Sequence, residues 1–185
     1  MAAELTLREI TVFGVGCLLT LAALNTGVAQ ARMVPSGSME PTVAPGDRLL
    51  VTPLHREVFR RGEMLVFTPP FGAVPWEHDT PWGGFLTLSD SQSYLKRCVG
   101  LPGDTVQVVR DRGVFVNGQR LVEPYIHQKP HYNYGPERVP ANSLFMLGDN
   151  RNNSFDSHYW GFLPEKNVTG RPAAIIWPPR HWRKL

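Results

Sequence analysis

The chain has 185 residues, a formal net charge of +3 and a sequence pI of about 9.1. This length suits one domain with an appendage, and 17 glycines and 17 prolines favour a strand-rich, turn-rich body over a helical bundle. The two cysteines, Cys17 and Cys98, are far apart in the chain, so we expect no disulfide, redox motif or metal framework.

An uncharged stretch occupies residues 10–31, after a short N-terminal segment of residues 1–9. A helix of that length rises about 33 Å, close to the roughly 30 Å of a bilayer's hydrocarbon core. The stretch therefore predicts one transmembrane helix. Its densely apolar part is only residues 12–24, however, and Ala29-Gln30-Ala31 is typical of the end of a cleaved secretory signal. The residues alone leave anchor and cleaved signal open.

Residues 34–51, VPSGSMEPTVAPGDRLLV, cannot form one helix, because three prolines interrupt them. Gly37 lies between two serines and permits a sharp turn, which would hold the hydroxyl of Ser38 on a stiff loop. Loops on rigid scaffolds often carry chemistry, although a plain turn explains Ser-Gly-Ser equally well. Residues 48–51 predict the start of a buried strand.

Short strand-like runs separated by turn signals fill the rest of the chain. Asn117-Gly118, for example, has the type I′ signature of a tight hairpin. We expect further strands at residues 62–67, 93–99, 105–109, 114–116, 143–147 and 173–177. The pattern predicts a single, mostly antiparallel β domain over residues 32–185.

Three segments stand outside this pattern. Residues 68–88 are rich in proline and aromatic residues and predict a rigid loop, which either folds over the core or contacts lipid headgroups through Trp76, Trp82 and Phe85. Residues 123–140 predict irregular structure. The basic tail, residues 180–184, is either solvated or close to anionic lipid.

A serine nucleophile requires a base. His158 near Asp156 is one candidate, but neighbouring positions on one loop seldom give triad geometry. The alternative is a Ser-Lys dyad, in which the lysine pKa must fall by about three units from about 10.4, roughly 4 kcal/mol, as burial can achieve. Lys96 lies among apolar residues and is the candidate base; a surface lysine on an edge strand is the alternative reading.

Several ordered motifs resemble those of type I signal (leader) peptidases. They are Ser36-Gly37-Ser38-Met39 with Pro41-Thr42, Gly46-Asp47, Tyr94-Leu95-Lys96-Arg97, Gly100-Leu101-Pro102-Gly103-Asp104, and Gly148-Asp149-Asn150-Arg151 through Ser154, Asp156 and Ser157. The resemblance runs from about residue 34 to residue 164. It implies the β fold of those enzymes, a retained N-terminal helix as a membrane anchor, and a catalytic domain on the extracytoplasmic side.

The resemblance also implies a role for each matching residue. Ser38 is the nucleophile and Lys96 the general base, while the Ser38 N–H and the Ser36 hydroxyl form the oxyanion hole. Ser154 orients the lysine and Asp156 braces its loop, whereas Asn150 and Arg151 are structural. Two shallow pockets would accept small residues at the −1 and −3 positions of an exported preprotein, lined by Val34, Pro35, Met39, Val43, Tyr94 and Leu95.

One residue departs from the family pattern, because His158 stands where many members have arginine. We expect an Asp156–His158 contact whose charge varies near neutrality. The expected partners are preprotein signal peptides and a lipid bilayer, with no nucleic acid, cofactor or metal. The alternatives are a related Ser-Lys maturase with a dedicated substrate, or an inactive membrane-anchored β domain that binds exported proteins.

Overall fold

The computed structural model describes residues 29–54, 58–70 and 93–185. Their elements in chain order are β1 (Gln30–Met33), η1 (Gly37–Met39), β2 (Arg48–Pro53), β3 (Met64–Phe67), β4 (Tyr94–Gly100), β5 (Thr105–Val109), β6 (Gly113–Val116), β7 (Gln119–Arg120), β8 (Tyr134–Arg138), β9 (Ser143–Leu147), α2 (Ser157–Trp160), β10 (Leu163–Pro164), η3 (Glu165–Asn167), β11 (Val168–Trp177), η4 (Pro179–His181) and β12 (Arg183–Lys184). Within these residues, every helix is too short or too polar to cross a membrane.

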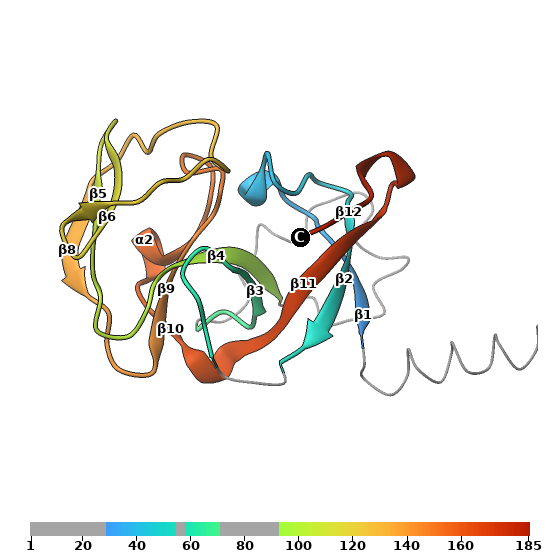
Figure 1. Ribbon diagram of the computed structural model, residues 1–185, viewed down its shortest axis with the longest axis horizontal. Helices are drawn as coiled ribbons and strands as arrows, with labels where there is room; N and C mark the ends of the chain where they lie inside the picture. Colours follow the sequence, from blue (N-terminus) through green and yellow to red (C-terminus); the bar gives the residue numbers. More distant parts are fainter. Residues whose placement is uncertain (1–28, 55–57, 71–92) are drawn as a thin grey trace, which may run out of the picture.

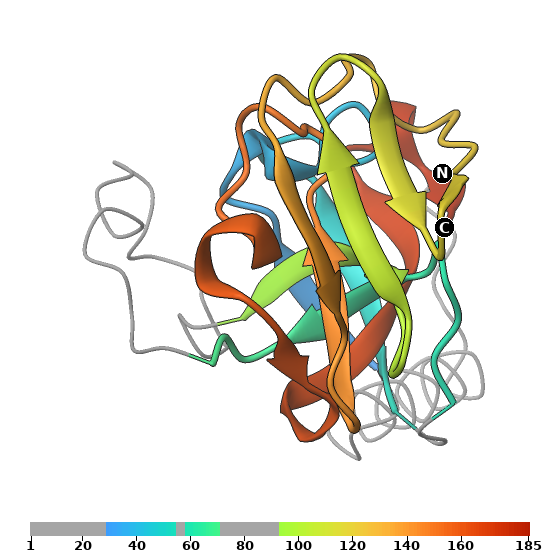
Figure 2. The same cartoon turned by 90° about the vertical axis from the view of Figure 1, so that its left-hand side faces the viewer.

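Antiparallel pairing joins the strands into two sheets (Figure 1). The eight-stranded sheet has the order β1-β2-β11-β3-β4-β9-β10, with β12 paired to β11, and the four-stranded sheet has the order β7-β6-β5-β8. Figure 2 shows the smaller sheet facing the viewer, in front of the larger one. The expectation of a mainly β, antiparallel domain is confirmed.

The end of the expected membrane span is a strand. Gln30 and Ala31 belong to β1, where they pair with Val51 and Leu50 of β2. These two residues, expected at the end of a transmembrane helix, are therefore in a sheet instead. Residues 10–28, and most of the aromatic loop at 68–88, lie outside the described residues.

Three elements differ from the sequence-based expectation. The segment expected to be irregular contains β8, an edge strand that tolerates Gly135-Pro136 because only β5 pairs with it. The loop at 148–160 ends in α2, which Asp156 caps by accepting a hydrogen bond from the N–H of His158. The basic tail contains β12, whose backbone pairs with β11 in the larger sheet while the side chains of Arg183 and Lys184 stay exposed.

One of the three apolar clusters lies beneath the loop at 34–47. Val34, Met39 and Val43 come from the loop itself and pack with residues of β2, β3 and β11, namely Leu49, Val51, Val66 and Ile175. The loop closes on itself as well, because the N–H of Val34 donates to the Asp47 carbonyl at 2.9 Å and the N–H of Gly46 to the Val34 carbonyl at 2.8 Å. Burial and these bonds make the loop a rigid support for Ser38.

Candidate active site

Ser38 lies in the single turn of η1 and is held from the outside by the loop after β9. The backbone N–H of Asn150 donates to the Ser38 carbonyl at 3.1 Å, and the Asn150 side-chain amide donates to the Gly37 carbonyl at 3.0 Å. These two bonds fix both sides of the turn. Sequence reasoning treated Asn150 as structural, and the contacts place it directly against the turn of Ser38.

Lys96 projects from β4 onto this turn. Its Nζ lies 2.6 Å from Ser38 Oγ, and the two residues are only 3% and 9% exposed. β4 pairs with β3 from Tyr94 onward, but its pairing with β9 begins only at Arg97. Lys96 is therefore the last residue of β4 before the pairing with β9 begins.

Hydrogen-bond donors lie close to the serine hydroxyl. Ser36 Oγ is 3.3 Å from Ser38 Oγ. The backbone N–H of Ser38 belongs to the first turn of η1, where N–H groups have no partner within the helix. A hydroxyl and a backbone N–H beside a serine are the donor types from which oxyanion holes are built.

Asp156 anchors the loop that follows. Its fully buried carboxylate accepts the Gly148 N–H at 2.8 Å through Oδ2, while Oδ1 lies 2.6 Å from His158 Nδ1. The expected Asp156–His158 contact is therefore present, and the His158 ring also stacks on Tyr132 with the centroids 4.0 Å apart. These contacts connect β9, the loop and α2.

Ser154 lines the same cavity as Ser38 and Lys96. Its Oγ is buried and has no hydrogen-bond partner among the described residues. The side chain packs against Gly148. The position suits the expected role near the lysine, but no bond between the Ser154 hydroxyl and the amine is formed here.

A cavity of about 440 Å³ opens above Ser38 and Lys96. Its lining comes from residues 35–38, from Tyr94 and Lys96, and from residues 152–155 with Tyr159. Of the six residues expected to bind substrate, Pro35 and Tyr94 are part of this lining. The other four contribute to the apolar cluster beneath the loop: Val34, Met39, Val43 and Leu95.

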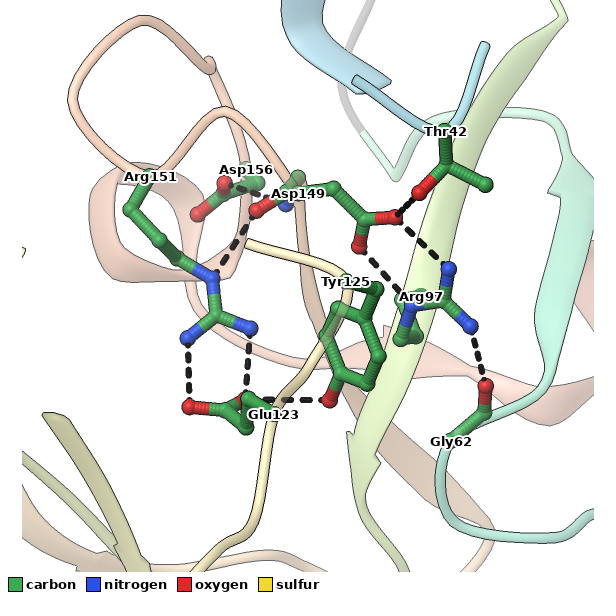
Figure 3. A network of polar contacts seen from close by, with 9 residues as sticks. Thr42, Gly62, Arg97, Glu123, Tyr125, Asp149, Arg151 and Asp156 are labelled. Carbon is green, nitrogen blue, oxygen red and sulfur yellow. Dashed lines mark hydrogen bonds and ion pairs between the residues drawn. The ribbon is translucent and has the colours of Figure 1, made fainter. Parts of the chain in front are cut away.

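A buried ionic network connects the segments that carry the residues of the site (Figure 3). Arg97, the neighbour of Lys96 in β4, donates to Asp149 through Nε at 2.8 Å and Nη2 at 2.6 Å. Asp149 also accepts the Thr42 hydroxyl at 2.5 Å, and Arg97 Nη1 donates to the Gly62 carbonyl at 2.5 Å. One carboxylate thus joins β4, the loop after η1 and the loop after β9.

A second buried pair extends the network. Arg151 donates to Glu123 through Nη1 at 3.1 Å and Nη2 at 2.6 Å, and to the Gly148 carbonyl through Nε at 3.0 Å. Burial alone would lower the pKa of Arg151, but the bonds to Glu123 outweigh it and raise that pKa. Tyr125 bridges the two pairs, because its hydroxyl donates to Glu123 and its ring lies 3.9 Å from the Arg97 guanidinium.

The described residues contain no cluster of three or more His, Cys, Asp or Glu placed to hold a metal ion.

Sequence reasoning did not single out Phe155 and Tyr159 as site residues, nor the pairing of Arg97 with Asp149. Both aromatic residues lie in the polar stretch from Gly148 to Trp160, which predicted only a compact, capped loop. Which of its side chains would face the cavity depends on the bends that Asp156 imposes. The one available signal was the position of two aromatic residues beside Ser154.

Comparison with known proteins gives the following similarities. Residues 7–177 match the family described as signal peptidase, peptidase S26. Signal peptidase I of Leptolyngbya laminosa is 44% identical over 174 residues, which cover 93% of this chain and 80% of that protein. Probable signal peptidase I-2 of a Synechocystis strain is 41% identical over 157 residues, covering 84% of this chain and 66% of that protein.

Two more distant similarities complete the comparison. Thylakoidal processing peptidase 1 of Arabidopsis thaliana, a chloroplastic protein, is 37% identical over 155 residues, which cover 84% of this chain and 44% of that protein. The crystal structure of a signal peptidase I from Enterococcus faecalis aligns with a TM-score of 0.44 at 27% sequence identity, covering 62% of this chain and 96% of that chain.

Proposed function

The chain belongs to the signal peptidase family, peptidase S26, and we propose that it uses Ser38 and Lys96 to remove N-terminal signal peptides from exported preproteins. It is a serine endopeptidase with the signal peptidase I activity of its relatives. The observation that carries the assignment of the two residues is the 2.6 Å between Lys96 Nζ and Ser38 Oγ.

The reaction begins with proton transfer from the serine to the lysine. Lys96 is almost completely buried, which disfavours its ammonium form and supports a neutral amine as the base. The amine takes the proton of Ser38 Oγ as the oxygen attacks the carbonyl carbon of the −1 residue. The Ser38 N–H and the Ser36 hydroxyl donate to the oxyanion, where one lost donor costs about 3–4 kcal/mol in the barrier.

The same lysine then serves the two remaining steps. Its ammonium gives the proton to the leaving amine, which is the new N-terminus of the mature protein, and the C–N bond breaks. The acyl group remains on Ser38 as an ester. A water molecule, deprotonated by the neutral Lys96, attacks that ester; the bond from the acyl carbon to Ser38 Oγ then breaks, Lys96 returns the proton to Oγ, and the signal peptide is released. Ser154 would help to orient the amine, and Asp156 would keep Ser154 in place through Gly148 and α2.

The preprotein would bind as an added strand. An extended peptide would lie beside the segments that carry Ser38 and Lys96, where main-chain hydrogen bonds would hold its scissile bond next to the reacting groups. Pro35 and Tyr94 would contact the small side chains at −1 and −3. Beneath them, Val34, Met39, Val43 and Leu95 would form an apolar floor that limits the depth of the two pockets.

Membrane attachment is a further part of the proposal. Residues 12–24 are densely apolar, and the first described strand, β1, begins only six residues later, at Gln30. One span ending before β1 would hold the domain that starts at Gln30 beside the bilayer, and the membership in the signal peptidase family favours the extracytoplasmic side. Carbonate extraction tests the anchor, and protease accessibility of residues 32–185 in sealed vesicles tests the side.

Purified protein and a preprotein ending in Ala-x-Ala test the activity. We expect cleavage after the second alanine, with a loss of at least about 10³-fold in both Ser38→Ala and Lys96→Ala. Lys96→Arg is the sharper variant, because it keeps a long basic side chain that cannot become neutral, and we expect it to be equally inactive. His127→Ala, an exposed histidine, is the matched control. Cleavage retained in any one of the three site variants would refute the dyad.

A further inference from the structure

Two aromatic residues line the cavity of Ser38 and Lys96 but have no role in the proposed reaction. Phe155 and Tyr159 stack with their centroids 5.5 Å apart and their planes at 26°, and both line the cavity that contains Ser38 and Lys96. Tyr159 is 69% exposed, so its ring stands open at the cavity. A large ring held open beside reacting groups is available for contact with substrate.

The aromatic pair is held in place before any substrate arrives. Tyr159 belongs to α2, where its N–H donates to the Asp156 carbonyl at 2.8 Å. The Ser157 hydroxyl accepts the N–H of Met146 at 2.9 Å and so ties α2 to β9. Beside it, the His158 ring lies 4.0 Å from the Tyr159 ring. Because these contacts order the helix, binding at the pair would cost little additional entropy.

The position of the pair indicates which half of the substrate it meets. The signal-peptide half is assigned to Pro35 and Tyr94, on the segments that carry Ser38 and Lys96. The remaining lining comes from residues 152–155 and Tyr159. The leaving amine must accept a proton from Lys96. The mature protein then departs along the side of the cavity that the signal peptide does not occupy.

We propose that Phe155 and Tyr159 bind the first two residues of the mature protein, +1 and +2, and favour apolar or aromatic side chains there over acidic ones. The inference rests on the proposed function, since it names the leaving half of the same substrate. It assigns the two rings as specificity-determining residues.

The chemistry of the lining accounts for the direction of this preference. Ring faces carry partial negative charge and favour apolar or ring-edge contacts over carboxylates. Lys96 is the only basic side chain among the described residues that line the cavity, and it must be neutral to act as the base. A carboxylate at +1 or +2 would therefore lose water of hydration without gaining a cationic partner.

The test uses one Ala-x-Ala preprotein with Phe or Asp at +1 and, separately, at +2, cleaved by the full-length enzyme. We expect wild type to favour Phe over Asp in kcat/KM by about 2- to 10-fold at one position or both, the range that one aromatic contact supplies. Phe155→Ala and Tyr159→Ala should bring this ratio close to one. Discrimination between Ala and Val at −1 should stay unchanged, because other residues set it.

Control variants separate the possible outcomes. Phe155→Leu and Tyr159→Leu keep apolar volume without a ring and replace any alanine variant that fails to fold. Val122→Ala changes an exposed side chain outside the cavity and should leave every ratio as in wild type. A wild type that does not discriminate at +1 or +2, or variants that discriminate as wild type does, would overturn the inference. Wild type unable to cleave any of the reporters would instead refute the proposed function.

Discussion

Gly148 lies directly against Ser154, with no space between them for a methyl group. A Cβ added at Gly148 would overlap Ser154 Oγ, and it would lie 2.6 Å from Ser154 Cβ and 2.5 Å from the Ser38 carbonyl oxygen. The glycine is therefore the point at which the loop after β9 approaches both the turn of Ser38 and the loop of Ser154.

We predict that Gly148→Ala reduces kcat by about 10²-fold while the protein remains folded. The added methyl group must displace the Ser38 turn, Ser154 or both, and a shift of about 1 Å at a catalytic group costs about that much. Steady-state kinetics and circular dichroism together provide the measurement. The double variant Gly148→Ala, Ser154→Gly should remain impaired, because the Ser38 carbonyl is still in the way. Full activity in either variant would contradict this account.

The Arg97–Asp149 pair should stabilise the fold. The effects of removing Arg97 and of removing Asp149 on the free energy of unfolding should not be additive. We expect Arg97→Ala or Asp149→Ala to destabilise the protein by about 3–5 kcal/mol, because each leaves a buried charge without its partner. The double variant Arg97→Ala, Asp149→Ala should be less destabilised than the sum of the single variants. Urea unfolding of all four proteins gives the coupling energy, and additive effects would show that the pair is not coupled.

Asp104 should make the stability of the protein depend on acid pH. Burial alone would raise the pKa of Asp104, but hydrogen bonds from the Arg61 guanidinium, the Leu101 N–H and the Asn117 amide outweigh it and hold the pKa below 3.8. A carboxyl group with a lowered pKa stabilises the fold above its unfolded pKa, and this contribution is lost as the pH falls toward the folded value.

Asp104→Asn should therefore be less stable than wild type at pH 7, and the difference should shrink as the pH falls below about 4. Urea unfolding at pH 7, 5 and 3 measures it. His131 and Asp111 form an exposed pair at 2.8 Å, so Asp111→Asn serves as a control with a small effect at every pH. A gap between wild type and Asp104→Asn that stays constant with pH would argue against this linkage.

The C-terminal tail contacts the loop at 34–47, which contains Ser38. His181 Nδ1 lies 2.7 Å from Asp47 Oδ1, the Arg183 guanidinium donates to the Thr42 carbonyl, and Leu185 packs against the apolar cluster beneath the loop. We predict that removing residues 181–185 costs about 1–3 kcal/mol, a fall in Tm of roughly 2–12 °C. Thermal unfolding measures this, with His127→Ala as the control. An unchanged Tm would show that the tail is dispensable.

Much of the architecture could be predicted from short-range signals. Alternating apolar runs and turn residues located β4, β5 and β9, and Asn117-Gly118 marked a hairpin in which both residues adopt positive φ. β8 could not be predicted in this way, because its proline and glycine are tolerated only at an edge that pairing with β5 creates. Similarly, β12 forms because β11 offers it an edge.

Some residues of the candidate site could likewise be predicted from the sequence, and others could not. Ser38 and Lys96 could be selected by residue type and by resemblance, and the fold brings them within 2.6 Å although 58 positions separate them. The role of Asn150 in fixing the serine turn, and the direction in which Phe155 and Tyr159 point, depend on contacts between distant segments. Side-chain direction within a loop follows from such packing, and residue type alone carries no signal for it.

The pairing of β1 with β2 has a consequence for the fate of the enzyme itself. Ala29-Gln30-Ala31 has the small-x-small form of the peptides that the enzyme is proposed to cut, yet Gln30 and Ala31 are pinned opposite Val51 and Leu50. A neighbouring copy would have to peel this strand from the sheet before attacking it. The side chains of Gln30 and Ala31 are exposed, but their pairing with β2 takes up backbone that an extended substrate must offer, so this stretch would resist self-cleavage for as long as β1 stays paired.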